Sequence, residues 1–153
     1  MAIPAGTPVP AFRLAREDLS PFTEADLRGR TSVLVFYPFA FSEFCTDQLG
    51  VYDAVLDDLE ARGATMYAVS CDNVHAQRAF REQLGIRIEM LSDWEPKGET
   101  CRAFDVLHPA GFPQRALVLV GPDGVVRWSH QAPTPNEVPG ANLIFDALEA
   151  AAA

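Results

Sequence analysis

Residues 33–37, VLVFY, constrain the fold most strongly, because they are almost all β-branched or aromatic and are followed at once by Pro38. Such an uninterrupted apolar run is typical of a strand buried on both faces of a parallel sheet. Pro38 has no backbone N–H and therefore ends the strand. Helical spacing begins near Ser42, so Cys45 falls in the first turn of the next helix. The sequence predicts a strand, a short aromatic loop and a helix that carries a cysteine at its start.

The position of Cys45 favours a reactive thiol. The first turn of a helix presents unpaired N–H groups and the positive end of the helix dipole, and both favour a thiolate over a neutral thiol. Cysteines at helix starts can therefore react at neutral pH. The alternative is that Cys45 is a small buried core residue, and its position alone leaves both interpretations open.

The rest of the chain repeats the order of strand and helix. Apolar residues at i, i+3, i+7 and i+10 form one face of a helix over 42–61, and Gly63 ends it. Asp72 or Asn73 is expected to cap a second helix that ends at Gly85. Further expected elements are strands at 65–70, 86–91, 115–120 and 125–129, helices near 101–104 and at 141–152, an edge strand at 12–14 and a loop at 20–30. This order predicts an α/β sandwich with a mixed sheet, formed by one domain over residues 1–153.

Composition narrows the possible functions. The chain has 12 basic and 21 acidic side chains, a formal charge of -9, which disfavours nucleic acid and anionic membrane surfaces as partners. The N-terminus lacks a secretory signal pattern, so a cytoplasmic location is expected. The three cysteines include no C-x-x-C pair and are best interpreted as free or redox-active thiols. Neither metal-ligand spacing nor a glycine-rich phosphate loop occurs, so no metal and no cofactor are expected.

Pro38, Ser42 and Cys45 have the spacing P-x-x-x-[T/S]-x-x-C, which resembles the active-site signature of the peroxiredoxin family. Gln48 stands where these proteins often have Glu or Gln, and Arg115, which leads an apolar strand, resembles their active-site arginine. The likeness covers nearly the whole chain and is greatest to the one-cysteine AhpE-type branch of the AhpC/TSA group. Ser42 replaces the usual threonine but keeps the hydroxyl. The resemblance implies a thioredoxin-like three-layer sandwich with a central mixed β-sheet, and association as a homodimer.

The resemblance also implies a thiol-dependent peroxidase that acts on hydrogen peroxide, organic hydroperoxides or peroxynitrite. Cys45 would attack the peroxide, and Arg115 would stabilise both the thiolate and the developing charge. Ser42 would point at the same place, Pro38 would shield the sulfur, and Gln48 would orient Arg115. Each residue has a simpler alternative, because proline often only ends a strand, Ser42 can be only a helix cap, and an isolated arginine is usually a surface charge.

The oxidised Cys45 must then be recycled from a sulfenic acid. Cys71 and Cys101 are the possible resolving cysteines within the chain, and Cys71 should lie on the same rim of the sheet as Cys45. Gly50 occupies the position where one peroxiredoxin branch has its resolving cysteine. If Cys71 and Cys101 are only buried structural residues, an external thiol or a redoxin completes the cycle.

Three other classes of function remain open. A thiol–disulfide exchange protein is disfavoured, because Ser42 stands where the first cysteine of a C-x-x-C motif would be. A non-enzymatic redox sensor would share only the oxidation step. A Cys-His hydrolase would need one of His75, His108 or His130 beside Cys45.

Overall fold

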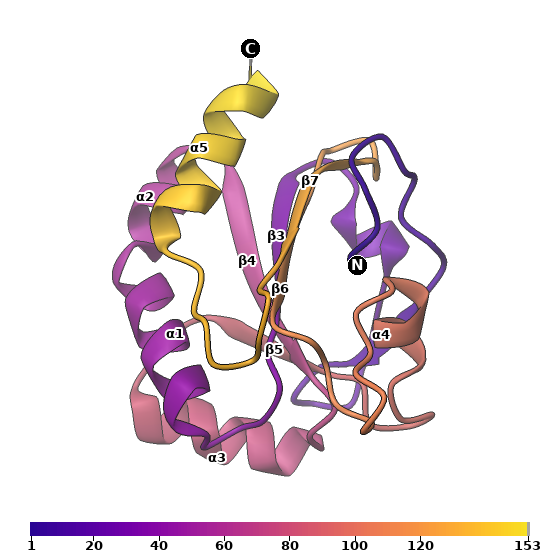
Figure 1. Cartoon of the computed structure of the whole chain (residues 1–153), viewed down its shortest axis with the longest axis vertical. Coiled ribbons are helices and arrows are strands. Elements are labelled where there is room, and N and C mark those ends of the chain that lie inside the picture. The colour runs from indigo at the N-terminus through magenta and orange to yellow at the C-terminus, as the bar shows by residue number, and fades with distance from the viewer. Residues whose placement is uncertain (153) are drawn as a thin grey trace.

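A seven-stranded mixed sheet forms the centre of the molecule in the computed structural model, which describes residues 1–152 (Figure 1). The strand order is β2-β1-β5-β4-β3-β6-β7. The central strands β3 (Thr31–Phe36), β4 (Ala64–Ser70) and β5 (Glu89–Ser92) are parallel, and β6 (Ala116–Val120) and β7 (Val126–Gln131) continue the sheet antiparallel. The mixed sheet of the predicted α/β fold is confirmed.

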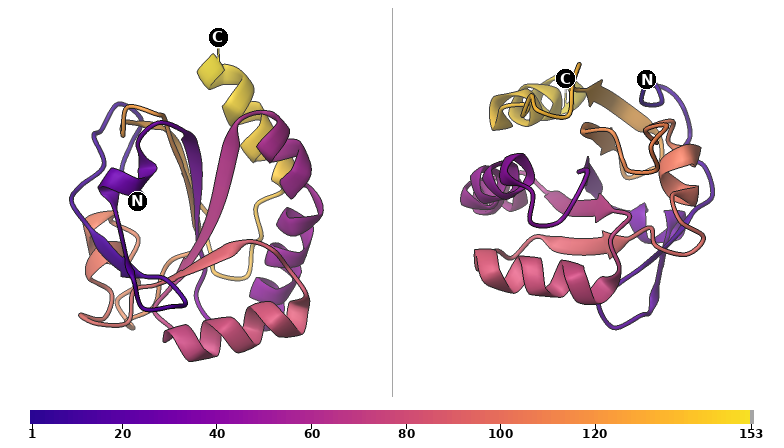
Figure 2. Two further views of the ribbon diagram at one scale, coloured as in Figure 1. Left: turned by 180° about the vertical axis from the view of Figure 1, so that it is seen from behind. Right: turned by 60° about the horizontal axis from the view of Figure 1, so that its bottom comes forward.

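Helices cover both faces of this sheet, but unequally (Figure 2). One face carries α1 (Glu43–Ala54), α2 (Leu56–Ala61), α3 (Val74–Leu84) and α5 (Ala141–Ala152). The other face carries α4 (Glu99–Ala103), the 3-10 helix η1 (Glu24–Leu27) and the N-terminal segment. The sheet therefore separates two apolar cores. No helix in residues 1–152 is long and apolar enough to cross a membrane.

Strand β3 shows why its residues from Val33 to Phe36 are all apolar. Val33 and Val35 contact the core under α1 and α5, whereas Leu34 and Phe36 contact the core under α4. Full burial of each such side chain contributes roughly 1.5–3 kcal/mol. Between Val33 and Phe36 both faces of β3 are buried, which explains why apolar and polar residues do not alternate there.

The caps of α1 and α3 follow the sequence closely. Ser42 is the N-cap of α1, and Asn73 rather than Asp72 is the N-cap of α3, accepting the N–H of Ala76 at 2.9 Å. Gly85 ends α3 with φ +66°, a left-handed conformation that glycine adopts without strain. The predicted helix over 42–61 is interrupted at Val55 and forms α1 and α2. Its apolar face nevertheless remains buried through Leu49, Tyr52, Leu56 and Leu59.

The strand predicted at 12–14 is present as β1 (Arg13–Ala15), but its predicted place at the sheet edge is wrong, and the predicted loop at 20–30 contains β2 (Pro21–Thr23) and η1. Strand β1 lies inside the sheet between β5 and β2, so β2 forms the edge. Each of these strands has three residues, and β2 begins with a proline, so neither has the length that makes alternation visible. Strand β5 also begins later than predicted, because the N–H of Ile86 still bonds the end of α3 at Arg81.

Candidate active site

Cys45 lies in the first turn of α1, beyond the end of β3. Its side chain is fully buried. Its backbone N–H donates to Ser42 Oγ at 3.2 Å, which is the N-cap bond of the helix. Ser42 therefore fulfils its simpler role as a cap, and the cap fixes Cys45 at the helix start. Because Ser42 Oγ accepts in this bond, the hydroxyl hydrogen of Ser42 can still be donated to another group.

Arg115 lies beside Cys45 because of strand pairing. It directly precedes β6, whose first residue Ala116 pairs with Phe36 at the end of β3. The Arg115 side chain is only 2% exposed, so the alternative interpretation of this residue as a surface charge is wrong. Its Nη2 donates to Cys45 Sγ at 3.4 Å, its Nη1 donates to Gln48 Oε1, and its Nε donates to the carbonyl of Pro135 at 2.8 Å.

Gln48 and Tyr52 extend this contact along one face of α1, three and seven residues after Cys45. Gln48 Nε2 donates to the Tyr52 hydroxyl at 3.2 Å, and that hydroxyl donates to the carbonyl of Pro139 at 2.6 Å. Burial raises the pKa of Tyr52, so its hydroxyl stays protonated. The sequence placed Tyr52 on the apolar helix face but did not reveal that its hydroxyl supports Gln48.

The carboxylate of Asp72 holds the loop between β3 and α1 in place. Asp72 accepts the backbone N–H of Ala40 and the hydroxyl of Ser70, both at 2.8 Å. Phe41 in this loop has φ +69°, an uncommon conformation for a residue with a side chain. Asp72, considered above as a helix cap, thus fixes the loop that leads into the Cys45 helix. Its sequence position after a strand gave no indication of this partner.

Pro38 is buried at the end of β3. It lines a cavity of 140 Å³ together with Phe39, Cys71, Asp72, Trp94, Lys97, Gly111 and Phe112. The ring of Phe39 is 48% exposed and packs on Phe112, with ring centroids 4.8 Å apart. Pro38 therefore closes the strand end and forms part of the wall of a small cavity at this rim of the sheet.

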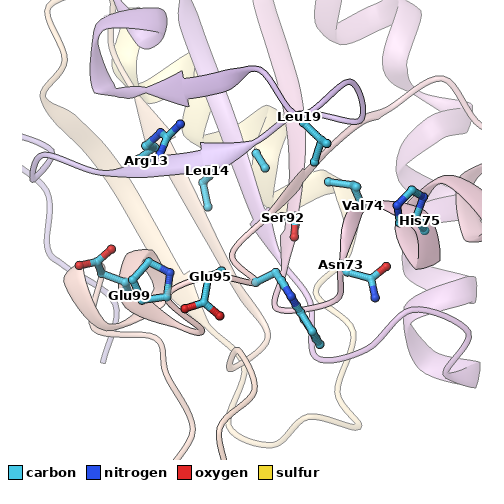
Figure 3. Close-up of a pocket in the computed structure, with 12 residues that line it drawn as sticks. Arg13, Leu14, Leu19, Asn73, Val74, His75, Ser92, Glu95 and Glu99 are labelled. Atoms are coloured by element: carbon cyan, nitrogen blue, oxygen red, sulfur yellow. The ribbon is translucent and has the colours of Figure 1, made fainter.

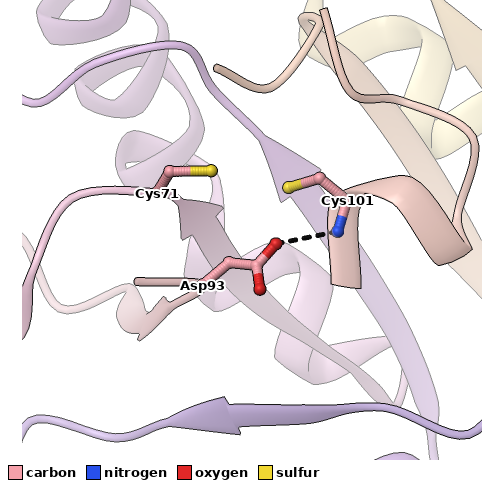
Figure 4. A group of neighbouring side chains, drawn as sticks. All are labelled: Cys71, Asp93 and Cys101. Carbon is pink, nitrogen blue, oxygen red and sulfur yellow. Dashed lines mark hydrogen bonds between the residues drawn. The ribbon is translucent and has the colours of Figure 1, made fainter. Parts of the chain in front are cut away.

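Cys71 and Cys101 lie on the other side of the sheet from Cys45. Cys71 follows β4 directly and is at the predicted rim, but it belongs to the core under α4, whereas Cys45 belongs to the core under α1. The sulfur atoms of Cys71 and Cys101 and a carboxylate oxygen of Asp93 lie within 4.8 Å of one another (Figure 4). No spacing in the sequence revealed this group, because its members come from three separate segments.

A larger cavity of 540 Å³ lies elsewhere, between β1 and the start of α3 (Figure 3). His75 lines this cavity, whereas Cys45 and Arg115 do not. His108 stacks on Phe112, and His130 stacks on Trp128. Within residues 1–152, the hydrogen bonds of Cys45 outside the helix ladder go to Ser42 and Arg115, so a Cys-His arrangement finds no support.

A buried cysteine at a helix start, hydrogen-bonded to a buried guanidinium at the end of a mixed α/β sheet, is an arrangement suited to a thiol-based oxidoreductase. Comparison with known proteins identifies the family within that class. The model of the AhpC/TSA family matches residues 5–129. The chain belongs to this family, the peroxiredoxins, and is a thiol-dependent peroxidase.

Individual relatives agree with this assignment. Alkyl hydroperoxide reductase C of Amphibacillus xylanus is 33% identical over 129 residues, which cover 80% of this chain and 69% of that protein. The crystal structure of Enterococcus faecalis AhpC has a TM-score of 0.87 and 26% identity, covering 99% of this chain and 93% of the other. Peroxiredoxin Q of Xanthomonas campestris has a TM-score of 0.83 and 26% identity, covering 95% and 97%. The thioredoxin-like fold is thereby confirmed, whereas assignment to the AhpE-type branch stays a prediction.

Proposed function

We propose that Cys45 is the residue that reduces the hydroperoxide. The observation that carries this proposal is the 3.4 Å contact between Arg115 Nη2 and Cys45 Sγ in a site where both side chains are buried. A guanidinium held at this distance can stabilise negative charge on the attacking sulfur and on the peroxide oxygen that it meets. The relative from Amphibacillus xylanus is named for the reduction of alkyl hydroperoxides, so we propose hydroperoxides, including hydrogen peroxide, as substrates.

The reaction needs a nucleophile, charge stabilisation and a proton. The Cys45 thiolate attacks the terminal oxygen of the peroxide, an S–O bond forms, and the O–O bond breaks. Negative charge then develops on the leaving oxygen, where the fixed donors of Arg115 stabilise it. The leaving oxygen takes up a proton and departs as alcohol or water, and Cys45 remains as a sulfenic acid.

Ser42 and Pro38 are proposed to assist this step. Ser42 Oγ accepts the N–H of Cys45, so its hydroxyl hydrogen is available to a peroxide oxygen. Pro38 offers no N–H that would compete for the substrate, and its buried ring reduces the access of water at the strand end. Gln48 acts through Arg115, because its amide oxygen accepts from Nη1 and its amide nitrogen is anchored on Tyr52.

We propose that an external thiol or redoxin reduces the sulfenic acid. Cys71 and Cys101 lie in the core under α4, whereas Cys45 lies in the core on the opposite side of the sheet, which disfavours a direct disulfide with Cys45. Trypsin separates the cysteines, because it cleaves after Arg30, Arg62, Arg78, Lys97 and Arg102. After one equivalent of peroxide, dimedone should label the peptide 31–62. A disulfide between this peptide and either of the other two would instead show an internal two-cysteine cycle.

Stopped-flow oxidation by substoichiometric hydrogen peroxide tests the role of Cys45. The wild-type protein should react orders of magnitude faster than a free thiol, and Cys45→Ser should lose the fast phase. Turnover with an added thiol separates a peroxidase from a sensor, since a sensor is oxidised without sustained peroxide consumption. A Cys45→Ser variant that reacts as fast as wild type would show that the assignment is wrong.

We further infer a cytoplasmic homodimer formed from single-domain chains. Free thiols suit a reducing compartment, and the half-exposed rings of Phe39, Phe41 and Phe44 near the Cys45 helix are apolar surface that association would bury. Light scattering at micromolar concentration should give twice the mass of the chain. A monomer under these conditions would contradict the dimer and leave the peroxidase proposal unaffected.

A further inference from the structure

Cys71 and Cys101 form a pair that the proposed peroxidase cycle does not use. They are separated by 30 positions in the sequence (101 − 71). Cys71 follows β4 and Cys101 lies in α4, yet their side chains point toward one another (Figure 4). Their sulfur atoms lie within 4.8 Å, and both side chains are buried, at 6% and 0% exposure. Two thiols of separate segments are thus brought together inside the apolar core.

Asp93 fixes the relative position of the two cysteines. Its backbone N–H donates to the carbonyl of Ser70, the residue before Cys71, at 2.8 Å. Its carboxylate accepts the N–H groups of Thr100 at 3.1 Å and Cys101 at 2.8 Å. One buried residue therefore connects the end of β4 to the start of α4. This connection holds the cysteines on anchored backbone rather than on mobile loops.

We propose that Cys71 and Cys101 are a second redox site, which a hydroperoxide converts to an intramolecular disulfide independently of Cys45. The site is separated from Cys45 by the sheet, and its oxidation needs no movement of the Cys45 helix. The oxidant belongs to the class of molecules that the family reduces, so no further reactant is required.

Access to the pair is through Cys71. This residue lines the 140 Å³ cavity beside Pro38 and Trp94, whereas Cys101 does not. The pKa directions of the two thiols also indicate that Cys71 is the one that reacts first. The hydrogen bond from Cys101 lowers the pKa of Cys71, and the same bond, together with burial, raises the pKa of Cys101. Of the two thiols, Cys71, which lines the cavity, is therefore the one that loses its proton more readily.

The oxidation takes place in two balanced steps. The Cys71 thiolate attacks one peroxide oxygen, an S–O bond forms, the O–O bond breaks, and the leaving oxygen takes a proton and departs as alcohol or water. Cys71 has then lost two electrons and is a sulfenic acid. The sulfur of Cys101 next attacks the Cys71 sulfur. The S–S bond forms, the S–O bond breaks, and the hydroxide leaves with the Cys101 proton as water.

A soft divalent cation such as Zn²⁺ is the competing occupant of this position, since thiolates and carboxylates bind it. The contacts of Asp93 favour the disulfide, because both of its carboxylate oxygens already accept backbone N–H groups. Zinc would need one of these oxygens and a further ligand to complete a tetrahedral site. Metal binding is therefore an outcome that the experiment must detect.

The experiment uses the full chain with Cys45→Ser, so that only the pair can react. The variant is treated with hydrogen peroxide, unfolded, alkylated and digested with trypsin. The expected product is peptide 63–78 joined to peptide 98–102, lighter by two hydrogen atoms than the separate peptides and released by dithiothreitol. The matched variant Cys45→Ser/Cys101→Ser should give no linked peptide, and dimedone should instead label peptide 63–78.

Three results would overturn the proposal. The first is that both cysteines of peroxide-treated Cys45→Ser remain fully alkylatable as thiols. The second is that linked peptides arise only between chains, as seen by mass on a non-reducing gel. The third is that native mass spectrometry finds bound zinc that prevents the disulfide. The wild-type protein, treated in the same way, should give the same linked peptide. If the peptide is missing from the wild-type protein as well, a folding defect of Cys45→Ser cannot be the cause. Failure of this pair would leave the Cys45 assignment intact.

Discussion

Arg115 shows how much of the site depends on the shape of a single side chain. Its guanidinium uses three nitrogens for three different acceptors, on Cys45, Gln48 and Pro135, while almost entirely buried. A buried charge is stable only when its donors are satisfied. A lysine would keep the charge, but its compact ammonium cannot reach three acceptors spread around a planar fork.

We therefore expect Arg115→Lys to slow the oxidation of Cys45 by about 10²-fold or more, the range for loss of one preorganised donor. The rate constant from stopped flow measures this effect. Arg127→Lys is the matched control, because Arg127 lies at the surface and pairs with Asp123 at 2.9 Å. If Cys45 of the Arg115→Lys variant were oxidised at the wild-type rate, the charge alone, and not the geometry of the guanidinium, would support the reaction.

Ser42 has a structural and a proposed chemical role that two substitutions separate. Ser42→Ala removes the cap of α1 and should lower the free energy of unfolding by about 1 kcal/mol, as measured by urea denaturation. It should also slow oxidation of Cys45, because the hydroxyl hydrogen is lost. Ser42→Thr keeps both groups and should restore both quantities. If Ser42→Ala changed stability but not rate, Ser42 would be a cap alone.

At the scale of elements, α1 does more than position one cysteine. Its buried face carries Cys45, Gln48 and Tyr52 in successive turns, and their bonds connect the helix to Arg115 and to the loop 132–140. The loop is thereby fixed at two carbonyls, those of Pro135 and Pro139. The cation beside the sulfur is consequently supported from a loop that is distant in sequence.

Removal of the Tyr52 hydroxyl tests this support. Tyr52→Phe leaves the Pro139 carbonyl and the Gln48 amide without their partner, and an unsatisfied buried group costs about 1–3 kcal/mol. The free energy of unfolding should fall by that amount. Tyr67→Phe is the control, because within residues 1–152 the Tyr67 hydroxyl forms no side-chain hydrogen bond, and it should change stability by less than about 0.5 kcal/mol. Equal effects would show that the network adds nothing to stability.

At the scale of the whole molecule, the sheet divides the thiol chemistry in two. Cys45 belongs to the core under α1, and Cys71 and Cys101 belong to the core under α4. All three were predicted as candidates, and Cys71 lies on the expected rim of the sheet. A role of Cys71 as the resolving cysteine is nevertheless disfavoured, because Cys71 and Cys45 share a rim of the sheet but lie on its opposite faces.

Closure of the Cys71–Cys101 disulfide should stabilise the whole chain. A cross-link that closes a loop of this length restricts the unfolded chain and contributes roughly 3–4 kcal/mol. Peroxide-treated Cys45→Ser should therefore unfold at a higher urea concentration than the same protein after dithiothreitol. The matched control is peroxide-treated Cys45→Ser/Cys101→Ser, which should show no such increase. A lower midpoint after oxidation would indicate that the disulfide strains the native structure.

The sequence by itself determined the elements that depend on local physics. Apolar periodicity and caps located β3, β4, α1, α3 and α5, and the spacing from Pro38 to Cys45 indicated the nucleophile. Short-range rules failed for β1 and β2, whose three residues are held by pairing with distant strands rather than by their own pattern.

Only the tertiary structure decided which distant groups meet. Sequence resemblance indicated Arg115, but its burial against Cys45 follows from the pairing of β6 with β3. The contacts of Tyr52 with Pro139, of Asp72 with Ala40, and of Cys71 with Cys101 leave no mark in local spacing. The physical reason is that periodicity reports whether a residue faces the core, whereas the identity of its neighbour there is set by strand order and by the face of the sheet.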